Sequence, residues 1–270
     1  GLGLRLALLQ LASWGHPETT GLPTIDAYLS AALIESTGAD ENYTEKLLKL
    51  PNLGCHFQRL PVSAVEPDWN ALGFDNTQPI LLCPGTHFKY APQYDEVLAE
   101  ICRRLGKCKL VFFSHHPAWR AVLEERLRGA FETAGLQLDD HLVFIPWLGR
   151  EEFHGLMQRA DVYLDTIGFS GFNTAMQAVN CALPIVTRDS RFLRGRLAAG
   201  VLERLGLTEL VADSEESYIS LAVRLVRERD FRDDVSLRML ERRSILYDDT
   251  APIRALEELL LEQCRATNAR

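Results

Sequence analysis

Residues 160–187, which read ADVYLDTIGFSGFNTAMQAVNCALPIVT, carry the pattern best suited to chemistry. The stretch predicts a short apolar strand, a loop broken by Gly168 and Gly171, and a helix that begins at Asn173. Such a layout presents free backbone N–H groups and hydroxyls to an anion at the start of the helix. It therefore predicts a phosphate site with Asn173 and Thr174 in the first helical turn. The alternative is an ordinary strand-to-helix loop, because doubly wound domains contain many such loops that bind nothing.

Two cations lie in comparable positions. Lys89 ends the loop PGTHFK, just before a helix expected from Pro92. It could neutralise a diphosphate, or it could be a surface lysine with no role in binding. Arg150 begins a helix and is followed by two glutamates. Because a cation is badly placed at the positive end of a helix dipole, Arg150 is either paired with a neighbouring glutamate or held for an anion.

Several other chemistries are disfavoured. The chain has no G-x-G-x-x-G fingerprint, no P-loop motif and no G-x-S-x-G nucleophile elbow. His115 and His116 show neither zinc-ligand nor triad spacing, and one of them is expected to cap a helix. The six cysteines form no C-x-x-C pair, so we expect buried thiols, no metal site and a cytoplasmic location.

These residues must be positioned by a regular alternation of strands and helices that starts at Pro79. Strands are expected at 80–83, 109–114, 141–145, 162–164, 185–187 and 209–212, and helices at 92–105, 118–134, 150–159, from 173, at 193–205 and within 214–265. This pattern predicts an α/β fold with a Rossmann-like parallel sheet and helices on both faces. Ligands of such sheets lie beyond the carboxyl ends of the strands, which singles out the loops at 84–89, 114–119, 146–151 and 166–174.

The first part of the chain is less regular. A buried strand is expected at 4–14, a polar loop at 15–24, a helical turn at 24–28, and a strand that ends at Pro51. Residues 61–78 are rich in proline and are expected to be a linker. A buried strand so near residue 1 also suggests a piece of a longer protein.

The composition of the chain argues against some classes of binding partner. The 270 residues are 47% hydrophobic and 24% charged, as in ordinary globular proteins, and the formal net charge is −8. A nucleic-acid partner is therefore not favoured. No apolar run reaches the length of a membrane span.

Taken together, LASWGHPETTGLPTID, YTEKLLKLPN, ADVYLDT, ALPIVT and ERLGLTELVADSEESYISLAVRL resemble, in order, the catalytic region of O-GlcNAc transferases and their bacterial relatives, which include cytoplasmic N-glycosyltransferases that modify adhesins. The resemblance implies a GT-B glycosyltransferase of two Rossmann-like lobes. It would transfer a hexose from a UDP-sugar to a protein side chain with inversion and without metal or other cofactor. Residues 1–78 would end the first lobe, and 79–270 would form the nucleotide-sugar-binding lobe.

The resemblance also implies site residues. Lys89 matches the lysine that contacts the diphosphate, and Asn173 and Thr174 match the polar pair that holds the phosphates. Leu148 and Arg150 fall in the segment that reads the uracil. The other donor-side positions are Thr86, His87, Phe153, Gly171, Phe172 and Gln177. The acceptor side would comprise the loop with His16, Glu18, Thr19, Thr20 and Gly21. His16 is either a candidate for a catalytic role or a structural histidine.

Departures from the family pattern move the likeness toward the N-glycosyltransferase branch, whose usual donor is UDP-glucose. Phe172 and Gln177 stand where animal O-GlcNAc transferases have a histidine and an aspartate, and Phe153 replaces a second histidine. The resemblance places the first lobe's own histidines upstream of Gly1, so the chain would need a missing N-terminal lobe. Two alternatives stay open: a GT-B transferase or epimerase acting on a small molecule, and a degenerate lobe that only binds nucleotides or other proteins.

Overall fold

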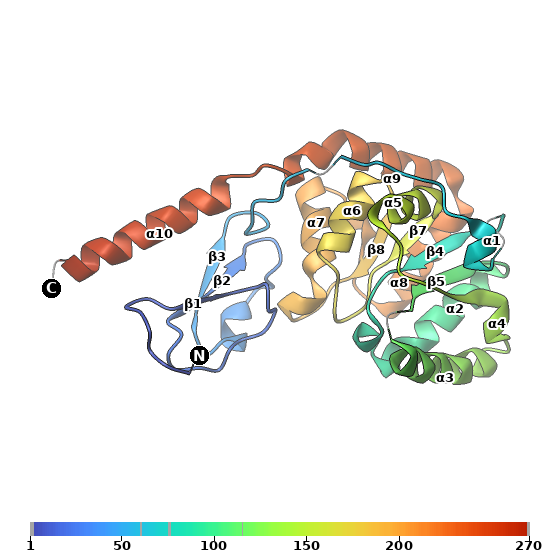
Figure 1. Cartoon of the computed structure of the whole chain (residues 1–270), viewed down its shortest axis with the longest axis horizontal. Helices are drawn as coiled ribbons and strands as arrows, with labels where there is room; N and C mark the ends of the chain where they lie inside the picture. Colours follow the sequence, from blue (N-terminus) through green and yellow to red (C-terminus); the bar gives the residue numbers. More distant parts are fainter. Residues whose placement is uncertain (1–2, 60, 75–76, 115, 269–270) are drawn as a thin grey trace.

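The computed structural model describes residues 3–59, 61–74, 77–114 and 116–268, and it contains two parallel sheets (Figure 1). The smaller sheet has the order β1-β2-β3, formed by Leu11–Ser13, Ala27–Ala31 and Lys46–Leu50. The larger has the order β6-β5-β4-β7-β8-β9, formed by Leu142–Ile145, Lys109–Phe113, Ile80–Cys83, Val162–Leu164, Ile185–Arg188 and Val211–Ala212. The predicted α/β fold with parallel strands is confirmed.

The larger sheet reverses its strand order between β4 and β7, which is the doubly wound arrangement of nucleotide-binding folds. Its strands are short apolar runs, and Ile80–Cys83 is completely buried, as expected for strands covered on both faces. The loops that follow β4 and β7 therefore diverge at the carboxyl edge of the sheet, where a crevice forms.

Helices cover both faces of this sheet. On one side α2 (Asp95–Leu105) packs against α3 (Pro117–Thr133) and α8 (Glu215–Arg227). On the other, α6 (Asn173–Asn180) packs against α7 (Leu197–Leu205) and α9 (Arg229–Arg242), and α5 (Arg150–Arg159) provides the crossover from β6 to β7 (Figure 1). The remaining helices are α1 (Trp69–Leu72), α4 (Leu138–His141) and α10 (Ala251–Asn268), with 3-10 turns at Ala39–Asn42, His87–Lys89, Pro92–Tyr94, Leu193–Gly195, Thr208–Leu210 and Arg243–Leu246. None of the described helices has the length and apolarity that a bilayer crossing needs.

Two expectations for the first part of the chain were wrong. The strand expected at 4–14 is limited to β1, and Leu4, Leu6 and Leu8 are 66%, 73% and 86% exposed, because β1 is an edge strand and no described element covers them. The helical turn expected at 24–28 does not form: residue 24 lies in a turn, and residues 27–28 begin β2. All five residues of β2 are buried and pair with β3, and the first three also pair with β1, so tertiary pairing overrides the local pattern.

The predicted linker runs along α5. Val65 donates its N–H to Glu151 O at 3.0 Å, and a Cβ on Gly155 would lie only 2.0 Å from Val65 O. Glycine therefore permits this close approach. The linker leads from the smaller sheet past α5 to α1, and α10 extends back to contact β3 (Figure 1).

We call the smaller sheet with its loops the first unit, and the larger sheet with its helices the larger unit. The two units also contact each other directly. Trp14 packs edge-on against Phe172 with ring centroids 4.9 Å apart, and Asn52 Nδ2 donates to Asp249 Oδ2 at 2.7 Å. A Cβ on Gly200 of α7 would lie 2.3 Å from Cγ2 of Ile34. The loop after β1 is thereby fixed close to the start of α6.

Candidate functional site

A cavity of about 370 Å³ lies at the carboxyl edge of the larger sheet, beside α5 and α6. We call it the aromatic cleft, and its lining consists of Pro84, Phe113, Trp147, Leu148, Arg150, Phe153, Asn173, Thr174 and Gln177. These residues come from the ends of β4 to β6 and from the first turns of α5 and α6. This is the place where open parallel sheets bind ligands.

One wall of the aromatic cleft is built from rings. Phe113 lies 5.4 Å from Phe153 and 6.3 Å from Trp147, measured between ring centroids. The Trp147 side chain is 72% exposed, so its surface is available to a ligand. Flat, apolar walls of this kind suit a planar heterocycle such as a nucleobase.

The polar end of the cleft offers a free cation. Arg150 is exposed and has no ion pair within the described parts of the chain. The nearby Glu152 does not pair with Arg150. Instead, Glu152 Oε2 accepts the N–H of Gly149 at 3.1 Å and so caps α5. The structure therefore favours a role for Arg150 as a cation held for an anion over a pair with a neighbouring glutamate.

The start of α6 is also open to an anion. Its N-cap is Phe172, which offers no side-chain acceptor, and the Asn173 side chain is exposed. Orphan N–H groups of the first turn therefore remain for a ligand. The Thr174 hydroxyl lies 2.8 Å from Tyr163 OH, which fixes its position at the edge of the cleft.

The preceding loop is held by Asp165. Its carboxylate accepts the N–H of Gly171 at 3.0 Å and the hydroxyl of Thr187 at 2.7 Å, so this side chain caps the loop. Burial raises the pKa of Asp165, while these hydrogen bonds and the charge of Lys89 oppose the rise. A Cβ on Gly171 would lie 2.5 Å from Thr174 Oγ1, so this position requires glycine.

Lys89 lies on the other side of that loop. Its Nζ donates to Ser170 O at 3.1 Å and lies 4.5 Å from the centre of the Phe169 ring. Burial lowers the pKa of Lys89, and the negative charge of Asp165 counteracts part of this effect. Lys89 therefore lines a neighbouring groove rather than the aromatic cleft.

The structure thus brings six of the predicted donor-side residues together around the aromatic cleft: Leu148, Arg150, Phe153, Asn173, Thr174 and Gln177. Thr86 and His87 lie outside its lining, and His87 is buried with its ring 5.7 Å from that of Phe144. Phe172 turns toward Trp14 and Phe57 of the first unit.

Three lining residues were missed by sequence reasoning. Pro84 and Trp147 occur in two of the loops that were singled out, so their positions after strands were a usable signal. Phe113 ends a strand, and nothing in the local pattern distinguishes it from a core residue. His116 caps α3 as expected, since its Nδ1 accepts the N–H of Ala118 at 3.3 Å, and His115 lies outside the described residues.

The predicted acceptor-side loop is fixed to the smaller sheet. Thr19 Oγ1 and the Thr20 N–H donate to Glu45 at 2.6 and 2.7 Å, and Glu18 pairs with Arg194. Glu18 and Thr19 line a cavity of about 240 Å³ between the two units. His16 is exposed next to this lining, and its carbonyl accepts the Tyr28 hydroxyl at 2.5 Å.

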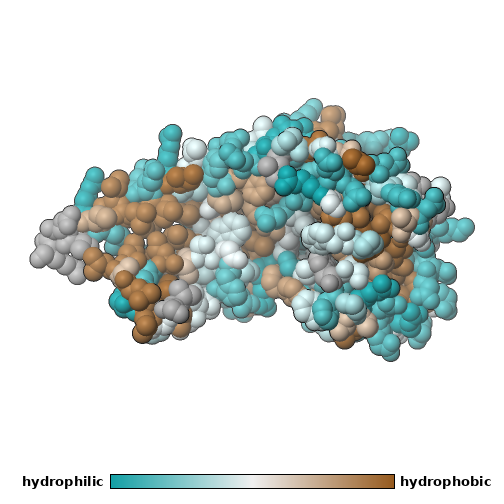
Figure 2. Space-filling model, viewed as in Figure 1, coloured by the Kyte–Doolittle hydropathy of each residue, from teal (hydrophilic) through white to brown (hydrophobic). Residues whose placement is uncertain are grey.

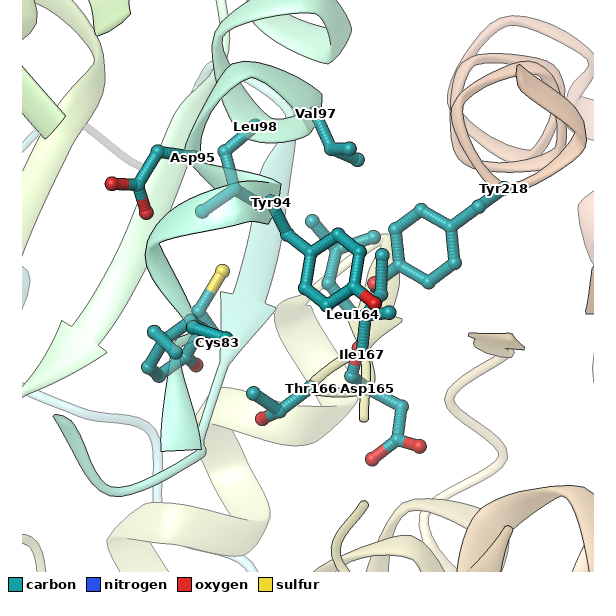
Figure 3. A pocket seen from close by; sticks show the side chains of 12 residues that line it. Cys83, Tyr94, Asp95, Val97, Leu98, Leu164, Asp165, Thr166, Ile167 and Tyr218 are labelled. Carbon is teal, nitrogen blue, oxygen red and sulfur yellow. Dashed lines mark hydrogen bonds between the residues drawn. The ribbon is translucent and has the colours of Figure 1, made fainter. Parts of the chain in front are cut away.

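On the α2 and α8 side, the crevice between β4 and β7 is nearly filled. Figure 3 shows Tyr94 and Tyr218 over the end of β7, near Cys83, and only about 20 Å³ remains there. This is room for a water molecule rather than a nucleotide. The ligand space of the sheet is thus on the α5 and α6 side.

One group of described residues could hold a metal ion: Cys102, Cys108 and His141, all buried. The Sγ atoms of the two cysteines lie 3.7 Å apart. The cluster lies among α2, β5 and α4, away from the aromatic cleft, and contributes no residue to its lining.

The fold is that of a doubly wound α/β lobe with a cavity at the carboxyl edge of its sheet. The family model for glycosyl transferase family 41 matches residues 79–251, and the chain belongs to that family.

Known proteins extend the likeness over nearly the whole chain. A probable SPINDLY-type UDP-N-acetylglucosamine–peptide N-acetylglucosaminyltransferase from Solanum lycopersicum is 26% identical over 263 residues, which are 96% of this chain and 28% of that protein. A UDP-N-acetylglucosamine–peptide N-acetylglucosaminyltransferase from Caenorhabditis elegans is 33% identical over 139 residues, covering 51% of this chain and 12% of that protein.

A solved structure of a mutant O-GlcNAc transferase from Thermobaculum terrenum matches 95% of this chain and 48% of its own, with a TM-score of 0.80 and 25% identity. A sucrose-phosphate synthase from Thermosynechococcus elongatus has a TM-score of 0.61 at 15% identity over 90% of this chain and 59% of its own, which shows likeness of fold. The chain thus spans less than half of each of these relatives of the O-GlcNAc transferase and SPINDLY type.

Proposed function

We propose that this chain is the donor-binding part of an inverting, metal-independent glycosyltransferase that moves a hexose from a UDP-sugar to a protein side chain. The observation that carries the proposal is the aromatic cleft, where Arg150, unpaired within the described residues, and the uncapped start of α6 lie at one end of an aromatic wall. Membership of glycosyl transferase family 41 and the peptide transferases among the relatives support the same reaction.

Each part of the site would act on one part of the donor. Trp147, Leu148 and Phe153 would hold the uracil, and Arg150 with the N–H groups near Asn173 would hold the diphosphate. Lys89 would turn from Ser170 O toward the same phosphates. The acceptor amide or hydroxyl would attack the anomeric carbon as the bond to UDP breaks. The electron pair of that bond would pass to the diphosphate, and the acceptor's proton would pass to a base on the acceptor side, for which His16 is the candidate. Fixed donors in a dry cleft can supply roughly 3 kcal/mol each to such a step.

The acceptor side favours a polypeptide over a small molecule. The cavity at the loop of Glu18 and Thr19 shares Phe192 and Arg194 with the groove lined by Lys89, so the two spaces adjoin along the junction of the units. A small-acceptor transferase or epimerase would need a closed site. His16, Thr20 and Gly21 stay proposed contributors on this side, with His16 as the candidate for a catalytic role.

Two further parts of the proposal concern the protein's setting. The missing N-terminal lobe would cover the exposed leucines of the first unit and complete the acceptor site. The free state of all six cysteines supports a cytoplasmic location. Phe153, Phe172 and Gln177 favour the bacterial N-glycosyltransferase branch and a glucose donor, whereas the names of the relatives favour N-acetylglucosamine.

The test is calorimetric titration of the chain with UDP, UDP-glucose and UDP-N-acetylglucosamine. We expect saturable UDP binding that Lys89→Ala weakens, and the tighter sugar nucleotide identifies the donor. Lys107→Ala is the control, because Lys107 is exposed before β5 at the opposite edge of the sheet. If no nucleotide binds, the degenerate-lobe alternative is favoured and the donor-side assignment must be withdrawn.

A further inference from the structure

A second groove, of about 500 Å³, lies beside the aromatic cleft across the loop that contains Gly168 and Phe169. We call it the basic groove. Its cations are Lys89, Arg188, Arg191 and Arg194, its aromatic residues are Phe88, Tyr94, Phe169 and Phe192, and its remaining lining is Ala91, Gln93, Ile167, Gly168, Asp189 and Ser190. The proposed donor site leaves most of this groove unused.

The groove carries a surplus of positive charge. Its single carboxylate, Asp189, is paired with Arg196 outside the lining. Arg188 lies 3.3 Å from Glu215, and Arg194 pairs with Glu18. In the described part of the chain, Lys89 and Arg191 contact neutral oxygens, those of Ser170 and Asn42. On a chain of net charge −8, this is a local basic surface that can attract carboxylates.

Aromatic rings back the arginines. Arg188 lies 5.5 Å above the Tyr94 ring, and Arg191 and Arg194 lie 5.2 and 5.7 Å from the Phe192 ring. Phe88 and Phe192 are 63% and 43% exposed. A ring beneath a guanidinium holds it in place without neutralising it, and exposed rings offer apolar contact to side chains of a partner.

We propose that the basic groove binds an extended, acidic segment of the protein acceptor, with carboxylates on Arg188, Arg191 and Arg194 and apolar or aromatic side chains on Phe88 and Phe192. The inference rests on the proposed function, and it names the acceptor class. The groove adjoins the cavity of the Glu18 loop through Phe192 and Arg194, so a chain that crosses it leads toward the proposed acceptor side. A nucleic acid would meet the same arginines, but because it carries a charge on every nucleotide, the acidic remainder of the surface would repel it more strongly than a peptide with a few carboxylates.

The experiment uses a fluorescein-labelled peptide of alternating Glu, Ser and Tyr, compared by fluorescence anisotropy with the same peptide carrying Gln for Glu. We expect the acidic peptide to bind at least about tenfold more tightly and its affinity to fall as salt is raised. Arg191→Glu should reduce the affinity at least about tenfold, because it reverses a charge in the groove. Arg229→Glu is the matched control, since Arg229 is 82% exposed on α9 outside the groove lining.

Several results would overturn the assignment. These are equal affinity for the Glu and Gln peptides, an equal effect of the control variant, tighter binding of a single-stranded oligonucleotide, or displacement by inorganic phosphate at the peptide's own concentration. Titration of the unsubstituted chain with UDP separates the two proposals. A chain that binds UDP without the peptide refutes only the groove, and a chain that binds the peptide without UDP refutes only the donor site.

Discussion

Arg150 is an unusual residue for the first position of a helix, because the macrodipole is unfavourable to a cation there by about 0.3–1 kcal/mol. We expect Arg150→Gln to weaken UDP binding about tenfold or more, as one charge-assisted hydrogen bond is lost, and to leave the free energy of unfolding unchanged or slightly higher. Calorimetry with UDP and thermal unfolding measure the two effects.

Arg229 offers a matched control for this change. It is also the first residue of its helix, and its pair with Asp233 is exposed. Arg229→Gln should leave UDP binding unchanged. If Arg150→Gln keeps full affinity for UDP, or if it lowers stability markedly, Arg150 is a structural residue and the phosphate site lies elsewhere.

At the residue scale, the site residues that could be predicted from the sequence are those that lie beside the carboxyl ends of the strands. Leu148, Arg150 and Asn173 follow or begin elements at the carboxyl edge, and the structure places all three around one cavity. Phe113 could not be predicted in this way, because whether the last residue of a strand faces the core or the cleft depends on how neighbouring loops close. The position of Lys89 across the loop from the cleft depends on the path of Ser170 and Gly171, which spacing does not specify.

At the scale of elements, the loop from Thr19 to Gly21 depends on one carboxylate of the smaller sheet. Burial alone would raise the pKa of Glu45, but hydrogen bonds from Thr19 and Thr20 outweigh it and lower the pKa to about 2 from an ordinary 4.5. A lowered carboxylate pKa stabilises the fold above pH 4.5, and that contribution is lost as the pH falls toward 2.

We therefore expect Glu45→Gln to destabilise the chain at neutral pH and to reduce the loss of stability between pH 4.5 and 2 relative to the unsubstituted chain. Denaturant unfolding at a series of pH values measures the difference. Hydrogen exchange should also be faster in the loop of the variant. Parallel pH profiles for the two chains would show that Glu45 does not hold the loop through its charge.

Two glycines within helices, Gly200 and Gly129, provide a second test at this scale. They differ in how closely other atoms surround the position of an added Cβ. Gly200→Ala should be destabilising, since the new Cβ would lie 2.3 Å from Ile34 Cγ2 and 3.0 Å from Leu33 O, where the two units meet. Gly129→Ala in α3 should instead stabilise by about 0.5–1 kcal/mol, because nothing lies within 4 Å of its Cβ. Thermal unfolding decides the signs, and a stabilising Gly200→Ala would mean that the junction is loose.

The elements themselves were predictable wherever strands and helices alternate with clear turn signals. The helix expected at 150–159 and the strand at 162–164 coincide with α5 and β7. The prediction failed at 4–14 and 24–28, where a run of apolar residues has no fixed period and the outcome depends on pairing with a distant strand. β2 forms because β1 and β3 lie on either side of it, which no local window contains.

At the scale of the whole molecule, one exposed apolar surface lies away from the candidate site. Figure 2 shows apolar residues gathered over the region of the small sheet and α10. The exposed side chains include Leu4, Leu6, Leu8, Leu260 and Leu261. Exposed apolar surface of this kind is typical of an interface, and under the proposed function the N-terminal lobe of the transferase would cover it.

The chain should accordingly bind the dye ANS and self-associate as its concentration rises. Replacing Leu4, Leu6 and Leu8 together by serine should reduce both effects while changing the free energy of unfolding by less than about 0.5 kcal/mol per residue, because these side chains are already exposed. Leu237→Ser on α9, 55% exposed, is the control and should alter neither. ANS fluorescence and sedimentation velocity measure the outcome. A large loss of stability in the triple variant would show instead that these leucines pack within the chain in solution, and the apolar surface would then need no further lobe to cover it.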